Sequence, residues 1–127
     1  MTLYRLTKPR VSLELIPFYV PNNQTRLEIG WELFKRLRDK PEDTFCLAAV
    51  EDTLRAMVIA YVWKGDCHIW QAYAEPGFEY SKLMFDRLIS WAKEKGLTKL
   101  TTGTKRPRAM CRKWGFVQKD GQLVRLL

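Results

Sequence analysis

The stretch that decides the fold reads Ala109-Met110-Cys111-Arg112-Lys113-Trp114-Gly115-Phe116, near the C-terminal end of the 127 residues. An amphipathic pattern over residues 79–95 predicts a helix upstream of it, and an apolar run over residues 97–102 predicts a strand. Pro107 suits the first turn of a second, short helix that ends before the quoted Gly-Phe pair. Asp120-Gly121 is typical of the turn in a closing hairpin.

The upstream part of the chain predicts one helix and an antiparallel meander. Apolar residues at helical spacing predict a helix over residues 26–38. Three apolar runs, at residues 45–50, 54–63 and 67–73, are separated by turn signals and predict three consecutive antiparallel strands. A further strand is expected over residues 3–7.

Length and composition favour a single globular domain. With 46% apolar residues and 16 aromatic ones (5 Trp, 5 Tyr, 6 Phe), 127 residues can bury a core. No run of about 18 apolar residues predicts a membrane span, and no apolar leader is recognisable, so a cytoplasmic location is expected. Cys46, Cys67 and Cys111 lack CxxC spacing and are expected to be reduced thiols; with a single histidine, no metal site is predicted.

The net charge of +8 is concentrated in the C-terminal third. Residues 1–91 carry twelve basic and twelve acidic groups, whereas residues 92–127 carry ten basic groups and two acidic ones. Such asymmetry predicts an anionic partner, namely cofactor phosphates, nucleic acid or an acidic protein face; a merely solvated surface is the alternative. No aromatic residues alternate with the basic ones, which favours phosphate or acidic contacts over base recognition. The candidate patch comprises Lys105, Arg106, Arg108, Arg112 and Lys113.

The order of these elements, together with the segment 109–116, resembles the GCN5-related N-acetyltransferase (GNAT) fold. The resemblance implies a single domain of the α/β (α+β) class over residues 1–127. In that fold a central, mostly antiparallel mixed sheet is flanked by helices. If the activity of the family is retained, acetyl-CoA is the cofactor and an amine is the acceptor.

The family carries an R/Q-x-x-G-x-G/A signature in the turn before its central helix. Its glycines let backbone N–H groups approach the pyrophosphate of coenzyme A at the helix N-terminus. The resemblance puts this turn on residues 76–81, where Gly77 and Ser81 match and Glu79 replaces a glycine. A carboxylate about 4 Å from a phosphate costs about 1–4 kcal/mol, which Lys82 offsets only in part. Weak or absent coenzyme A binding is therefore expected.

The catalytic groups are less well defined than the turn. Members of the family commonly have a tyrosine four residues before the Gly-Phe pair, where it protonates the leaving thiolate; Cys111 stands there in this chain. The thiol is either a proton donor or a small apolar filler. His68 and Tyr73 are the other candidate acid–base groups, and core packing is the alternative for each.

Three functions remain open. The favoured one is a GNAT-like protein with a degenerate loop that serves as a non-catalytic assembly or interaction protein. Its segment 110–117 is similar to that of small GNAT-like proteins of tailed bacteriophages, some of them carried inside the virion. The alternatives are an active N-acetyltransferase that uses acetyl-CoA, and a basic protein associated with nucleic acid.

Overall fold

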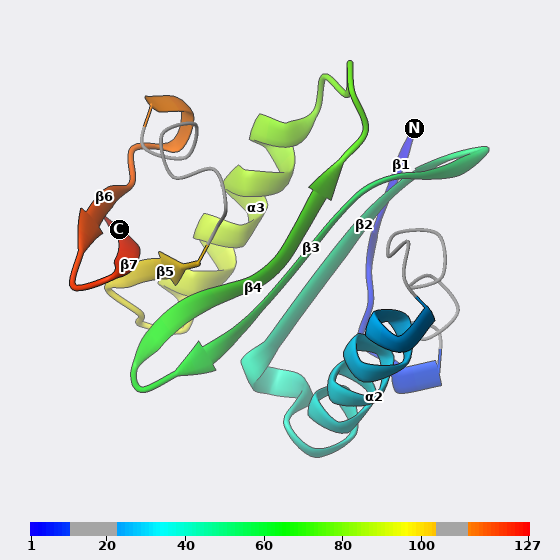
Figure 1. The fold of residues 1–127 in the computed structure, drawn as a ribbon, viewed down its shortest axis with the longest axis horizontal. Coiled ribbons are helices and arrows are strands. Elements are labelled where there is room, and N and C mark those ends of the chain that lie inside the picture. The colour runs from blue at the N-terminus through cyan, green and yellow to red at the C-terminus, as the bar shows by residue number, and fades with distance from the viewer. Residues whose placement is uncertain (11–22, 104–111) are drawn as a thin grey trace.

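Seven strands form one sheet in the computed structural model, which describes residues 1–10, 23–103 and 112–127 (Figure 1). The order across the sheet is β1-β2-β3-β4-β5-β7-β6. All neighbours are antiparallel except β4 and β5, which are parallel, so the predicted mixed sheet is confirmed. The strands are β1 (Thr2–Arg5), β2 (Thr44–Glu51), β3 (Thr53–Trp63), β4 (Asp66–Ala74), β5 (Lys99–Thr102), β6 (Val117–Lys119) and β7 (Gln122–Leu126).

Two long helices lie on opposite faces of β2, β3 and β4 (Figure 1). They are α2 (Asn23–Asp39) and α3 (Ser81–Glu94), and a short 3-10 helix, η2 (Pro41–Asp43), leads from α2 into β2. Helix α3 begins two residues later than the amphipathic pattern predicts, because the preceding chain first closes a turn. In that turn the Phe78 N–H donates to the Glu75 carbonyl at 3.0 Å, and Gly77 has a φ of 82°.

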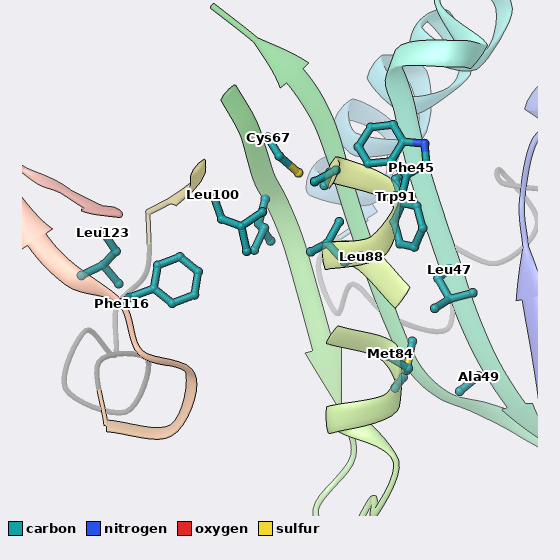
Figure 2. Packing of buried hydrophobic residues seen from close by; sticks show 14 residues of the cluster. Phe45, Leu47, Ala49, Cys67, Met84, Leu88, Trp91, Leu100, Phe116 and Leu123 are labelled. Atoms are coloured by element: carbon teal, nitrogen blue, oxygen red, sulfur yellow. The ribbon is translucent and has the colours of Figure 1, made fainter. Parts of the chain in front are cut away.

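The larger core lies between α3 and the sheet. Met84, Leu88 and Trp91 share one stripe of α3 because they are spaced by four and three residues, and they face the sheet (Figure 2). Phe116 and Leu123 complete this cluster from the C-terminal hairpin, beside Leu100 of β5 (Figure 2). The amphipathic helix predicted from the sequence is therefore confirmed, and it buries the face that the pattern indicated.

The smaller core lies between α2 and the N-terminal half of the sheet. Ile29, Leu33 and Leu37 of α2 pack on residues of β2 and β3, and Trp70 of β4 borders the cluster. Strand β2 reads as a continuous apolar run because its alternate residues enter the two cores: Phe45 faces α3 and Cys46 faces α2. No residue of β5, β6 or β7 belongs to the cluster under α2 as far as the described residues define it. The part of the sheet that α2 covers therefore ends at β4.

A bulge in β4 changes which face its last residues occupy. Ile59 of β3 pairs with Gln71 and Ala60 pairs with Ile69, so Trp70 is an extra residue without a partner in β3. A regular strand would put His68 and Tyr73 on opposite faces, since five positions separate them. With the extra residue, both lie on the face that α2 partly covers.

Candidate functional site

Strands β4 and β5 are paired over only a short distance. The parallel ladder joins Cys67, His68 and Ile69 to Leu100, Thr101 and Thr102, although β4 continues to Ala74. Beyond Ile69, no strand in the described part of the chain pairs with this edge of β4. The edge consequently presents backbone N–H and C=O groups with which an extended ligand could form hydrogen bonds.

The N-terminus of α3 opens beside a cavity of about 530 Å³. The N-cap residue Tyr80 forms no side-chain capping hydrogen bond, and the first N–H groups of a helix have no partner within it. Ser81 and Lys82 line the cavity with their neighbour Glu79, and residues 113–115 and Arg125 of β7 also line it. The structure thus brings together Ser81, Lys82 and Glu79, whereas Gly77 shapes the turn and does not line the cavity.

The charges around this cavity are mixed in sign. Lys82 and Arg125 contribute positive charge, and Glu79 and Asp86 contribute negative charge. The Lys82 Nζ lies 2.8 Å from the Asp86 Oδ2, so a carboxylate already competes for this cation, and the guanidinium of Arg125 stacks 5.1 Å from the Phe85 ring centroid. Glu79 lines the same cavity and is exposed. An anionic ligand at the first turn of α3 would therefore meet the favourable helix dipole and the unfavourable carboxylate together.

The C-terminal basic patch is described only in part. Lys113 lines the cavity and its Nζ lies 5.1 Å from the Trp114 ring centroid, while Arg112 is exposed in the same short helical segment, residues 112–114. The candidate proton donor and the rest of the patch lie outside the described residues: Cys111, Lys105, Arg106 and Arg108.

Arg125, Phe85 and Trp114 also line the cavity, although the sequence analysis did not single them out as site residues. Arg125 stands in a terminal strand without any motif, so its positive charge was the only signal in the sequence. Phe85 stands beside the apolar stripe of the predicted helix, and its ring centroid lies 4.7 Å from that of Trp114.

His68 lies on the other face of the sheet, away from this cavity. Its Nδ1 is 2.9 Å from the Thr101 Oγ1, and its ring centroid is 5.4 Å from that of Tyr61. Partial burial, and secondarily the positive charge of Arg36, lower the pKa of His68 below its usual value. The imidazole is therefore neutral at pH 7, but it stands where β4 and β5 are still paired. Tyr73 is nearer the unpaired end of β4, so the candidate acid–base groups do not converge with the cavity.

Titration of His68 should show a midpoint below the value of about 6.5 that is typical of an unfolded chain. At a pH between the pKa of His68 in the folded protein and that in the unfolded chain, the unfolded state binds more protons. The free energy of unfolding therefore decreases as the pH falls below about 6.5. Because the chain has one histidine, its imidazole proton resonance can be followed by NMR without assignment. Arg36→Gln should raise the midpoint part of the way, and Arg38→Gln, on a side chain that stacks on Phe34 instead, should leave it unchanged. A wild-type midpoint above 6.5 would contradict this account.

The two described cysteines are buried, one in each core. Burial raises the pKa of Cys46 and of Cys67 to about 12 each, so neither thiol is a nucleophile at neutral pH. Within residues 1–10, 23–103 and 112–127, no group of three histidine, cysteine or acidic residues could hold a metal ion. The described helices include none long and apolar enough to cross a membrane.

Comparison with known proteins finds similarity in structure alone. No protein-family model matches the sequence, and no curated protein matches it significantly. PaiA N-acetyltransferase from Thermoplasma acidophilum, in complex with coenzyme A, is 14% identical, with a TM-score of 0.63 over 98% of this chain and 97% of that one.

Two other acetyltransferases match over a similar extent. A GNAT-family acetyltransferase from Staphylococcus aureus Mu50 is 13% identical (TM-score 0.66, covering 99% of this chain and 98% of that one). A chimera of spermidine N-acetyltransferase SpeG from Vibrio cholerae and hSSAT is 15% identical (TM-score 0.68, 99% and 96%). At such identities the likeness concerns the fold, and the chain has the fold of the GCN5-related N-acetyltransferases.

Proposed function

We propose that this chain is a GNAT-fold protein that no longer transfers acetyl groups and acts as an interaction protein within an assembly. The observation that carries the proposal is Glu79, whose carboxylate lines the cavity at the first turn of α3. That turn is where the family binds the coenzyme A pyrophosphate. The nearest cation, Lys82, already pairs with Asp86. Binding of a diphosphate would therefore have to overcome one carboxylate and compete with another.

Two further features support a role in binding other proteins. The acid–base candidates His68 and Tyr73 lie on the face opposite the cavity, so neither of them is placed to move a proton beside it. Trp31 and Trp63 are 59% and 53% exposed, which is typical of residues that a partner covers. In this proposal the assembly is a bacteriophage virion, on the strength of the resemblance of segment 110–117.

The test is titration of the purified protein with acetyl-CoA by calorimetry, together with an assay for coenzyme A release in the presence of polyamines and peptide amines. We expect no saturable binding at micromolar concentrations and no release of thiol above the uncatalysed rate, because repulsion by Glu79 weakens the pyrophosphate contact. Folding is checked by circular dichroism of the same sample. Micromolar binding accompanied by turnover would overturn the proposal.

An N-acetyltransferase is the second candidate, and the free edge of β4 favours it. One structural neighbour, PaiA, was solved with coenzyme A. Beyond Ile69, the β4 backbone could pair with an extended cofactor arm, and the uncapped N-terminus of α3 could receive its phosphates. The amine would attack the thioester carbon directly, the C–S bond would break, and the proton lost from the amine nitrogen would balance the one taken up by the leaving thiolate, with no acyl-enzyme intermediate. Turnover in the assay above would support this candidate.

A further inference from the structure

Arg125 brings a guanidinium to the cavity beside α3. Arg125 of β7 pairs with Leu100 of β5, and Leu100 is buried in the cluster under α3, so both side chains lie on the α3 face of the sheet. The guanidinium carbon lies over the Phe85 ring, 5.1 Å from its centroid, and a Cβ atom at Gly115 would lie 3.9 Å from the Arg125 Nε. Contacts with α3 and with residue 115 therefore restrict the position of this cation.

No described carboxylate neutralises the guanidinium of Arg125. All the ion pairs in the described part of the chain join other residues. A guanidinium that lies over an aromatic ring still has N–H donors in its own plane, and their spacing matches the oxygens of a carboxylate. Arg125 is consequently a positioned cation that can receive an anion from a ligand in the cavity.

The other charges at the cavity determine how much charge such a ligand can carry. The lining includes three basic side chains, Lys82, Lys113 and Arg125, and two acidic ones, Glu79 and Asp86, which leaves one positive charge in excess. Lys82 and Asp86 pair with each other at 2.8 Å, whereas Lys113 has no carboxylate partner among the described residues. A single negative charge balances this excess, while a diphosphate would exceed it and would be repelled by Glu79.

Arg125 lies farther along α3 than the turn that contains Glu79. Glu79 precedes the helix, which begins at Ser81, whereas Phe85, the ring beneath Arg125, is four residues later. Four residues extend about 6 Å along a helix axis. The first turn of α3 therefore separates a carboxylate bound by Arg125 from Glu79, and this separation weakens their repulsion.

Aromatic side chains form the apolar part of the lining. Phe78, Phe85 and Trp114 all line the cavity, and each of them is only partly buried by the rest of the chain. The volume of about 530 Å³ falls in the range of about 300–1,000 Å³ that is usual for ligand sites, which combine apolar surface with a few charged groups. An apolar group can therefore lie next to an anion bound at Arg125.

We propose that this cavity binds a single carboxylate with an apolar group beside it, through Arg125 and Lys113. The C-terminal residue of a partner chain supplies both groups when its side chain is apolar, and its carboxylate would form a bidentate pair with Arg125. This inference rests on the proposed function, because it names the site and the chemistry of the partner that an interaction protein requires.

The probe is a short peptide without charged side chains that has a blocked N-terminus and ends in leucine with a free carboxylate. Its binding to the whole chain is followed by amide NMR shifts. We expect saturable shifts in the first two turns of α3, in residues 113–115 and in β7. The same peptide with a C-terminal amide, and one that ends in serine, should bind at least about tenfold more weakly. The amide lacks the charge, and serine lacks the apolar contact.

Arg125→Gln should weaken binding of the leucine peptide by at least about tenfold, because it removes the charged donors. The matched control is Arg87→Gln, which removes the same charge from an exposed residue of α3 outside the cavity lining and should bind like the wild type. Lys113→Gln changes an exposed side chain and should weaken binding about threefold; it tests the site if Arg125→Gln loses the folded spectrum.

Three results of these titrations would overturn the inference. They are absence of binding by the wild type, equal losses in Arg125→Gln and Arg87→Gln, and an affinity that neither Arg125→Gln nor Lys113→Gln lowers.

Two further ligands test the source and the kind of the anion. Isocaproate has a carboxylate and a leucine-like group without a peptide, so binding as tight as that of the peptide would identify a small acid and overturn the partner terminus. ADP has a diphosphate, and tighter binding of ADP than of the peptide would overturn the single carboxylate. Failure here remains distinct from failure of the proposed function, because acetyl-CoA binding and turnover are measured separately.

Discussion

Replacing Phe116 with alanine is expected to lower the free energy of unfolding by about 3–5 kcal/mol. Phe116 is 1% exposed, and its ring centroid lies 6.2 Å from that of Phe85, within the cluster that joins the C-terminal hairpin to α3. Removing the ring leaves a cavity that the surrounding strands can fill only in part. Domains of this size are stable by about 5–15 kcal/mol, so the loss is a large share of the total. Urea denaturation followed by tryptophan fluorescence measures it.

Val117→Ala provides the matched control for this prediction. Val117 is the next residue in the chain, but its side chain is 61% exposed, so its truncation should change the free energy of unfolding by less than about 0.5 kcal/mol. A Phe116→Ala variant as stable as Val117→Ala would mean that the hairpin is not anchored on α3 by this ring.

The variant Glu79→Gly should bind coenzyme A more tightly than the wild-type chain. Glu79 is exposed beside the uncapped N-terminus of α3, so its repulsion of a diphosphate is weakened by water and amounts to about 1–2 kcal/mol. The expected gain in affinity is about fivefold to thirtyfold. Isothermal titration calorimetry at low and moderate salt measures the change, and the gain should shrink as salt rises.

Two further variants separate the effect of charge from that of backbone freedom. Glu79→Gln removes the carboxylate without adding a glycine, and it should recover most of the gain if repulsion dominates. Glu94→Gln removes the same charge at the opposite end of α3, where it should leave the affinity unchanged. An affinity for Glu79→Gly equal to that of the wild type would show that another feature of the turn prevents binding.

The core elements of this fold could be predicted because their sequence patterns are set by burial. Met84, Leu88 and Trp91 repeat at helical spacing, and they are the residues that α3 buries. The run of residues 45–50 is apolar without alternation because β2 has a core on each side, and the strand was expected there. The order of such elements was sufficient to indicate the GNAT fold, in agreement with the solved structures that match.

The candidate site could be predicted only in part, because its shape depends on chain segments that meet from a distance. Glu79, Ser81 and Lys82 are neighbours in the sequence and were placed together by the resemblance. Arg125 reaches the same cavity from a strand more than forty residues away, and no local pattern marks it. The side of the sheet on which Tyr73 lies was equally hidden, since it follows from the bulge in β4 rather than from any continuous stretch.

The extra residue at Trp70 gives β4 one position at which its length can change without turning the rest of the strand. Deletion of Trp70 would restore the regular pairing with β3, and Gln71, Ala72 and Tyr73 would keep their present partners. Tyr73 would then stand four positions from His68 in a regular strand and would remain on the α2 side. A deletion elsewhere in the strand, with the bulge retained, would instead turn the residues beyond it to the opposite face. Homologues should therefore have either four residues between His68 and Tyr73, with a bulge, or three, without one.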